Sequence, residues 1–401
     1  MSEWKTVPAG TVATQRKDVV TLAPGVEYRT MGVRWYGRGA YDRGAGSTET
    51  IKAKRLFRAH GGDFVFNRID TQNGAFDVVP AELHGALATN EFPLYVLDPD
   101  RLLPRFLLLY FQQRSVLGQI DAMRAGSEGR SRWKEADFEA WRIPLPPLSE
   151  QRRIVDVMAA VDKQIDALHA ERQRAASLLA LARDAYPEGI ECALSSVVSG
   201  IQGGKSVQTS DEKPKTGEPA VLKLSAVQLG TFVASEAKRL SDLTGYTNAH
   251  RVAEGDLLIT RASGSFDRVG YAAIARNVAP RTYLPDLIWR IRTKPEVCSE
   301  TFLAHLLCAP SVRSTITASA RGTASMRKIN KAMLGSLRLP IPSLEEQSEY
   351  VQHCNAVAFA VENLDLELAD LRAFRSALLA SLLNQEIEIP ETYDALLTEV
   401  C

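Results

Sequence analysis

The chain has 401 residues, of which 45% are hydrophobic and 24% are charged, and its formal net charge is zero. A chain of this length exceeds one typical domain, so we expect two or more hydrophobic cores. No apolar run is long enough to cross a membrane and the N-terminus lacks an apolar signal segment, so we expect a cytoplasmic protein rather than a membrane or exported one.

Residues 1–145 are predicted to form a first globular domain of short strands and helices. A Gly-Asp turn at Gly62 opens a β-rich run that ends at Arg68, and residues 92–97 are a second candidate strand. Residues 102–119 favour helix. A cluster of arginines and aromatic residues at 34–43 and a basic loop at 129–134 lie in this domain.

Residues 146–187 are predicted to form one long helix. Ser149 is a candidate cap, and Pro187 and Gly189 end the helix near residue 185. Its apolar positions alternate at spacings of three and four, with Arg172 as the one break; they are Ile154, Met158, Val161, Ile165, Leu168, Ala175, Leu179 and Ala182. Such a heptad pattern, held over several repeats, predicts a coiled-coil seam.

Residues 188–341 are predicted to form a second globular domain, with strands at 256–261 and 287–291 and helix at 299–318. A second long helix follows within residues 342–386, and residues 387–401 form a C-terminal tail. The second helix breaks its heptads at Arg375; its seam positions are Tyr350, Cys354, Val357, Val361, Leu364, Leu368, Leu371, Leu378 and Leu382. At about 1.5 Å per residue each helix spans roughly 50 Å. We expect the two helices to pair antiparallel; the alternative is that each packs on its own domain.

The two halves of the chain are related by an internal repeat. Residues 144–151 correspond to residues 340–347 at an offset of 196, and Gly62–Arg68 corresponds to Gly255–Arg261 at an offset of 193. Repeats of this length indicate a duplicated folding unit. The sequence therefore predicts an α+β chain in which two globular domains are separated by two long helices.

The zero net charge conceals an uneven distribution. Lysine and arginine outnumber acidic residues by 20 to 17 in residues 1–142 and by 20 to 13 in residues 188–340. Residues 150–187 are balanced at six of each, whereas residues 341–401 have two basic and twelve acidic residues. Two mildly basic domains are therefore predicted, as expected of a nucleic-acid binder.

No motif for catalysis or for metal binding is recognisable. The six histidines and five cysteines are scattered, without spacing typical of zinc sites or disulfide frameworks. The segment from Ser199 to Ser206 resembles a phosphate-binding loop, but Ser199 replaces its first glycine and a polar, proline-broken stretch follows where a helix is required. A basic loop that contacts a DNA backbone through Lys205 is the better interpretation.

The order of these parts resembles the specificity subunits of type I restriction–modification systems. The resemblance rests on residues 145–155 and 339–347, each leading into a long helix, and on the two Gly-Asp blocks. It implies two target recognition domains, each for one half of a bipartite, asymmetric DNA sequence. It also implies helices that fix the half-site spacing and dock two methyltransferase subunits. S-adenosylmethionine, ATP and Mg²⁺ would be bound by those subunits and by restriction subunits, and this chain would hold no cofactor and perform no catalysis.

Ten basic residues are candidates for DNA contact within this interpretation. They are Arg34, Arg38, Arg68, Arg132 and Lys134 in the first domain and Lys205, Lys223, Arg261, Arg327 and Lys328 in the second. Arg68 and Arg261 have a structural alternative, namely pairing with carboxylates beside their strands. Three other functions stay open: the recognition subunit of another methylation-based phage-defence system, a coiled-coil adaptor that does not bind DNA, and a nucleotide-dependent enzyme built on the Lys205 loop.

Overall fold

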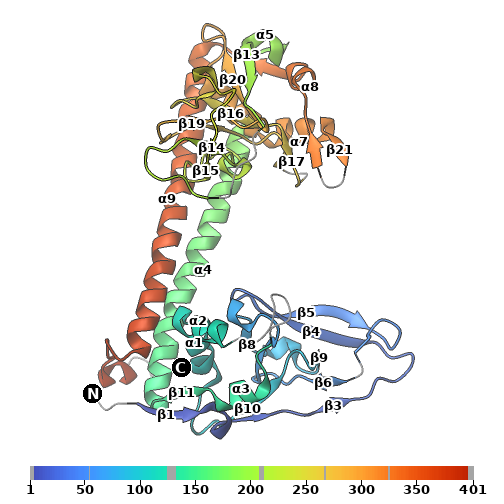
Figure 1. Ribbon diagram of the computed structural model, residues 1–401, viewed down its shortest axis with the longest axis vertical. Helices are drawn as coiled ribbons and strands as arrows, with labels where there is room; N and C mark the ends of the chain where they lie inside the picture. Colours follow the sequence, from blue (N-terminus) through green and yellow to red (C-terminus); the bar gives the residue numbers. More distant parts are fainter. Residues whose placement is uncertain are drawn as a thin grey trace. The chain divides into compact units, whose positions relative to one another are not determined.

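The computed structural model describes residues 4–53, 55–123, 132–206, 212–265, 268–323 and 326–395 (Figure 1). It divides into two units, each considered by itself: unit 1 comprises Met1–Ala167 with Leu368–Cys401, and unit 2 comprises Leu168–Glu367. Each unit contains a globular part and a segment of both long helices, α4 (Leu148–Asp184) and α9 (Leu344–Leu383). Residues 396–401 of the predicted tail lie outside the described residues.

Unit 1 is built on two larger sheets, a separate strand pair and three short helices. The first sheet has the order β2 (Ala13–Gln15), β10 (Leu94–Leu97), β7 (Phe64–Phe66) and β8 (Phe76–Val78). The second has the order β3 (Val19–Val20), β6 (Leu56–Arg58), β9 (Leu87–Thr89), β4 (Tyr28–Arg34) and β5 (Gly39–Gly46). The helices are α1 (Pro104–Phe111), α2 (Arg114–Ala122) and α3 (Glu135–Ala140). Buried phenylalanines of β7, β8, α1 and α3 form the centre of the core.

Unit 2 repeats the first sheet and the three short helices of unit 1, with α6, α7 and α8 in the places of α1, α2 and α3, and it adds α5. Its four-stranded sheet has the order β13 (Val198–Gly203), β20 (Ile288–Thr293), β16 (Leu257–Thr260) and β18 (Ala272–Ile274). Its helices are α5 (Leu194–Val197), α6 (Glu300–Cys308), α7 (Pro310–Ser319) and α8 (Lys331–Gly335). A separate sheet has the order β15 (Ala237–Arg239), β14 (Ala220–Leu222) and β19 (Thr282–Tyr283). The predicted duplication is confirmed by this shared topology.

The same antiparallel strand pair leads into each long helix. In unit 1, β1 (Lys5–Pro8) pairs with β11 (Arg142–Leu145), so that Lys5 lies opposite Leu145. In unit 2, β12 (Ile190–Ala193) pairs with β23 (Arg338–Ile341), so that Ile190 lies opposite Ile341. The chain segment at the start of each repeat therefore holds the strand that precedes its helix.

The Gly-Asp blocks have the same role in both units. Gly62 and Gly255 adopt φ angles of +93° and +82°, which glycine tolerates best. The carboxylate of Asp63 accepts the N–H of His60 (3.1 Å) and pairs with Arg16 (2.7 Å). The carboxylate of Asp256 accepts the N–H of Ala253 (2.9 Å) and pairs with two arginines of β20. Each aspartate thus ties a turn to neighbouring strands at the entrance of the central strand.

A buried glutamine explains the end of each proline-rich segment. Gln151 Oε1 accepts the N–H of Leu103 (2.8 Å), and its amide group donates to the carbonyls of Arg101 and Pro146. Gln347 makes the same three bonds, with the N–H of Ser299 (3.0 Å) and the carbonyls of Val297 and Pro342. Both side chains are almost fully buried. In each unit this residue fastens the first turn of the long helix to the segment that begins α1 or α6.

Within each unit the two long helices run antiparallel and pack together, as predicted. In unit 2, Tyr350 Oη donates to the Arg183 carbonyl (2.7 Å), and Arg172 pairs with Asp365 (2.9 Å). In unit 1, Arg375 pairs with Asp162: its Nε donates to one carboxylate oxygen of Asp162, and its Nη2 donates to the other (2.9 Å). The two arginines that break the heptads therefore bond the opposite helix.

The predicted seam residues are all buried or partly buried. The most enclosed are Ile154, Met158, Leu168, Cys354 and Leu368. Leu179, Tyr350, Val361 and Leu382 are also buried. The other predicted positions are partly buried: Val161, Ile165, Ala175, Ala182, Val357, Leu364, Leu371 and Leu378. The heptad spacing thus identifies the packed face of each helix.

The predicted cap of the first long helix is wrong. The helix α4 begins at Leu148, so Ser149 lies inside the first turn. The residue that precedes α4 is Pro147, which corresponds in the repeat to Ser343 before α9 but has no side-chain atom that could accept a hydrogen bond. In α9, Ser343 Oγ accepts the N–H of Glu346 (3.3 Å) and the Glu346 carboxylate accepts the N–H of Ser343 (2.9 Å), which is a capping box.

A buried histidine makes unit 2 sensitive to acid. His305 Nδ1 accepts Arg183 Nε (3.4 Å), and His305 Nε2 contacts Asn355 Oδ1 (2.9 Å), a pattern that suits the neutral ring. Burial, aided by Arg183 and Arg276, lowers the pKa of His305 to about 4. Between that pH and about 6.5, the pKa of an unfolded histidine, the unfolded chain therefore binds more protons.

We expect the free energy of unfolding to fall by up to about 3 kcal/mol as the pH drops through this window, and to be unaffected by His305 above it. In His305→Gln, whose amide can make both bonds without titrating, this component should be absent. Urea unfolding at several pH values measures the difference between the two proteins. An identical pH dependence in both would contradict the assignment.

Candidate nucleic-acid interface

The β4–β5 hairpin of unit 1 has one buried face and one basic face. Met31 and Val33 are buried, whereas Arg34 and Arg43 are exposed. In the pairing of the two strands, Gly32 lies opposite Tyr41. The Arg34 guanidinium carbon lies 4.2 Å from the centre of the Tyr41 ring. A β-carbon at Gly32 would come within 3.1 Å of that ring and 3.0 Å of Arg43 Cδ, so glycine makes room for both side chains. The hairpin therefore presents a stacked, planar cation at its surface.

Arg68, Arg132 and Lys134 come together at the end of β7. Ile69 forms an antiparallel bridge with Arg132, and the N–H of Trp133 donates to the Arg68 carbonyl (3.0 Å). The Arg68 side chain is only 16% exposed and pairs with Glu135 (3.5 Å). The Arg132 side chain is 47% exposed and donates to Glu91 (2.9 Å), and Lys134 is exposed. Residues 129–131 of the predicted basic loop lie outside the described residues.

The equivalent site in unit 2 is a basic β ribbon. It consists of β17 (Ala262–Ser263), β22 (Met326–Lys328) and β21 (Arg321–Thr323). Ala262 pairs with Lys328 and Ser263 pairs with Arg327, which repeats the bridge between Ile69 and Arg132. Arg321, opposite Lys328, adds a further cation. The preceding Arg261 lies partly buried with its guanidinium carbon 5.8 Å from the Trp289 ring centre.

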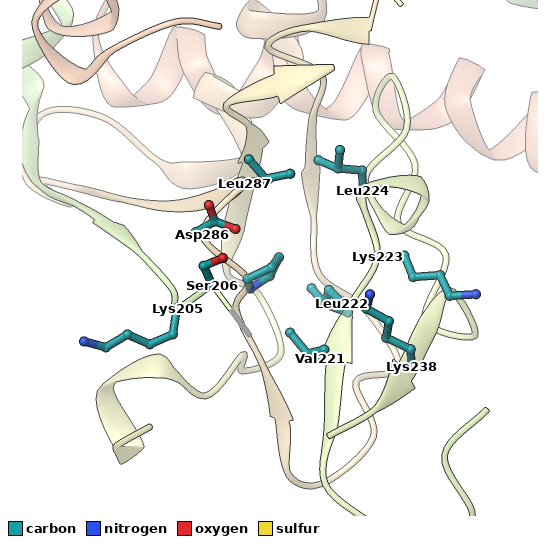
Figure 2. Close-up of a pocket in the computed structure, with 10 residues that line it drawn as sticks. Lys205, Ser206, Val221, Leu222, Lys223, Leu224, Lys238, Asp286 and Leu287 are labelled. Atoms are coloured by element: carbon teal, nitrogen blue, oxygen red, sulfur yellow. The ribbon is translucent and has the colours of Figure 1, made fainter. Parts of the chain in front are cut away.

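Lys205 and Lys223 line one cavity of about 310 Å³ in unit 2 (Figure 2). Figure 2 shows Lys205 and Asp286 on one side and Lys223 and Lys238 on the other, with apolar side chains such as Leu222 between them. Tyr246 Oη donates to the Lys205 carbonyl (3.3 Å), and burial together with Asp286 raises the pKa of Tyr246 to about 12. The cavity thus combines cations with an apolar floor.

The ten candidate residues fall into four groups. Arg34 and Arg38 lie on the hairpin, Arg68, Arg132 and Lys134 lie at the end of β7, and the other two groups are the ribbon and the lysine cavity of unit 2. Sequence reasoning missed Lys238, because it reaches the cavity only through the pairing of β15 with β14, opposite Val221. Of the segment Ser199–Ser206, which resembles a phosphate-binding loop, the part up to Gly203 belongs to the strand β13 (Val198–Gly203).

Neither a membrane-spanning helix nor a metal-binding cluster occurs in the described part of the chain. No described helix is long and apolar enough to cross a membrane. Over the same residues, no group of three or more histidine, cysteine, aspartate or glutamate side chains is placed to hold a metal ion.

Two copies of one α+β unit, each followed by a long helix and each with an exposed basic surface, define a family. The profile of the type I restriction modification DNA specificity domain matches residues 1–176 and again residues 198–356. The chain therefore belongs to this family.

Individual relatives agree with this assignment. The chain is 23% identical over 310 residues to the type I restriction enzyme EcoKI specificity subunit of Escherichia coli K12, which covers 72% of this chain and 66% of that protein. It is 20% identical over 280 residues to the StySPI specificity subunit of Salmonella potsdam, with coverages of 64% and 59%. The chain thus matches less than two thirds of the length of either relative.

Solved structures share the fold. A chain from a type I R-M system, solved in work on its complex assembly and conformational transition, has a TM-score of 0.58 at 19% identity, with 96% of this chain and 98% of that chain covered. The type I restriction–modification S subunit from M. genitalium has a TM-score of 0.51 at 12% identity, with coverages of 95% and 96%.

Proposed function

We propose that this protein is the DNA sequence-specificity subunit of a type I restriction–modification complex and carries out no catalytic step itself. Each unit recognises one half of a bipartite DNA target, and the two long helices set the spacing between the half-sites. Two methyltransferase subunits bind the helices, and restriction subunits join when the complex cleaves DNA. S-adenosylmethionine, ATP and Mg²⁺ belong to those partners.

The observation that carries this proposal is the duplicated unit with unlike surfaces. The shared sheet and helices hold each unit together, while the added strands differ: unit 1 has the β4–β5 hairpin, and unit 2 has β14, β15 and β19. Exposed arginines and lysines supply phosphate contacts that do not depend on sequence, whereas shape and planar guanidinium groups supply base recognition. Two different surfaces on one scaffold suit an asymmetric target.

The outer faces of the long helices support a docking role. Phe359 and Leu366, seven residues apart on α9, are 64% and 66% exposed, and Leu178 and Leu181 of α4 are also exposed. Large apolar side chains away from a packed seam are typical of partner interfaces. The seam residues themselves, including Leu364 and Leu368, stabilise the helix pair, so their substitution would test folding rather than docking.

The double variant Phe359→Asp with Leu366→Asp is expected to lose co-purification with its methyltransferase subunit, because two charges would be buried at the interface. Circular dichroism and thermal unfolding should stay close to wild type, since both residues are exposed. His353→Asp, an exposed position outside this face of α9, is the matched control. Normal complex formation by the double variant would exclude this face as the docking site.

DNA recognition is tested by sequencing methylated adenines in the host genome, which yields the bipartite motif, and by measuring binding to duplexes that carry it. We expect scrambling of either half-site to abolish specific binding. Arg34→Ala should weaken binding by about 1–3 kcal/mol, and Lys328→Ala should reduce the salt slope by about one. Arg372→Ala, an exposed arginine of α9, is the control. Equal binding to native and fully scrambled duplexes would contradict the proposal.

A further inference from the structure

The tip of the β4–β5 hairpin carries an exposed aromatic residue in a conformation that its residue type disfavours. We infer that Tyr36 inserts against the base stack of DNA as an aromatic wedge in the half-site recognised by unit 1. This inference rests on the proposed function and adds a base-stacking contact to it.

The turn geometry singles out Tyr36. Residues 35–38 form the turn, and the N–H of Arg38 donates to the Trp35 carbonyl (3.4 Å). Its two central residues, Tyr36 and Gly37, both have positive φ angles of 60° and 66°. This is the pattern of a type I′ hairpin turn, whose first central position favours asparagine, aspartate or glycine. A bulky aromatic residue there is strained, and strained residues gather at functional sites.

The neighbouring backbone holds this turn in place. The N–H of Tyr36 donates to the Asn73 carbonyl (2.6 Å), and the N–H of Gly37 donates to the Gly74 carbonyl (3.1 Å). Asn73 ends a short helical turn, η2 (Thr71–Asn73). Farther along the hairpin, the Asp77 carboxylate accepts the N–H of Ala40 (2.6 Å). The tip is therefore a fixed platform, so that little conformational entropy is lost when its side chain binds.

The surroundings identify DNA as the occupant. The side chains at the tip are exposed to solvent and do not belong to the core: Tyr36 is 72% exposed and Trp35 is 42% exposed. Three exposed arginines belong to this hairpin: Arg38 lies in the turn, Arg34 ends β4 beside it, and Arg43 lies farther along β5. Cations bind the phosphates on both sides of a base step, and an aromatic ring between them can stack on bases of any sequence. A surface for a protein partner would not require exposed arginines both in and beside one turn.

The experiment compares the wild-type protein with the variants Tyr36→Asn and Tyr36→Phe. Each protein binds a DNA duplex that carries the motif found from adenine methylation. In this duplex the fluorescent base 2-aminopurine replaces, one at a time, each base of the half-site recognised by unit 1. Tyr36→Asn places the residue type that this turn prefers, so its thermal stability should equal or exceed that of wild type. We expect it to bind DNA about tenfold or more weakly with an unchanged salt slope, because stacking releases no counterions. Tyr36→Phe keeps the ring and should bind within about twofold of wild type.

The fluorescence of 2-aminopurine separates stacking from other contacts. Wild type and Tyr36→Phe should raise it at one step of the half-site, and Tyr36→Asn should not. Wild-type affinity and fluorescence in Tyr36→Asn would overturn the wedge while leaving DNA recognition intact. Loss of methyltransferase association with unchanged DNA binding would also overturn it, in favour of a protein contact. A wild-type chain that does not distinguish the motif from scrambled duplex would instead contradict the proposed function.

Discussion

Replacing Gln347 by leucine is expected to lower the free energy of unfolding of the chain by about 3–5 kcal/mol. The substitution keeps the size of the side chain but leaves the N–H of Ser299 and the carbonyls of Val297 and Pro342 without their partner in a buried site. Each buried polar group that loses its hydrogen bond costs about 1–3 kcal/mol. Urea unfolding of the full-length protein measures the change.

Two further variants make this result specific. Gln151→Leu removes the equivalent bonds in unit 1 and should cost a similar amount. Gln352→Leu changes an exposed glutamine of the same helix as Gln347 and should alter stability by less than about 0.5 kcal/mol. Equal effects of Gln347→Leu and Gln352→Leu would show that the buried glutamine does not fasten the helix.

Replacing Asp256 by alanine is expected to cost about 3–5 kcal/mol of folding stability in unit 2. Its carboxylate is fully buried and pairs with Arg290 (3.0 Å) and Arg292 (2.7 Å), and Arg290 is itself buried. Removal of the aspartate leaves a buried guanidinium group without its counter-charge, which is strongly destabilising. Arg290 also donates to Gln202 and to two backbone carbonyls, so the arginine cannot leave its site easily.

The conservative variant Asp256→Asn keeps an acceptor for the N–H of Ala253 and should be intermediate between wild type and alanine. Glu296→Ala, an exposed acidic residue of the same unit, should change stability by less than about 0.5 kcal/mol. Thermal and urea unfolding of the four proteins distinguish these cases. If Asp256→Ala unfolded like Glu296→Ala, the carboxylate would have no role in holding the turn.

The long helices could be predicted from the sequence to within a few residues at each end. The predicted segments 146–187 and 342–386 contain the helices Leu148–Asp184 and Leu344–Leu383. A heptad pattern that continues over several repeats, with proline at one end, narrowly limits where each helix can begin and end. The repeat could also be predicted, since the strand order and helices recur at the two Gly-Asp blocks.

The basic surfaces were harder to predict, because they depend on pairings between distant segments. Residues 28–46 contain many glycines and polar residues and lack clean alternation, so the β4–β5 hairpin left no strand pattern. Arg68 has an acidic partner, Glu135, that lies far along the chain, and Lys238 reaches its cavity through a neighbouring strand. Gln151 and Gln347 look like ordinary surface residues of a first helical turn until the segments around Leu103 and Ser299 fold against them.

The arginines within the two seams have a consequence for how the helices find one another. An apolar heptad pattern alone fits equally well after a slip of seven residues. Such a slip in one direction would place Arg172 opposite Arg372 instead of Asp365, and in the other direction opposite Ala358. Since the bonded partners lie 193 and 213 residues apart in sequence, α4 is synthesised long before α9. Hydrophobic packing alone would allow several registers when α9 pairs with α4, and the two charge pairs therefore select one of them.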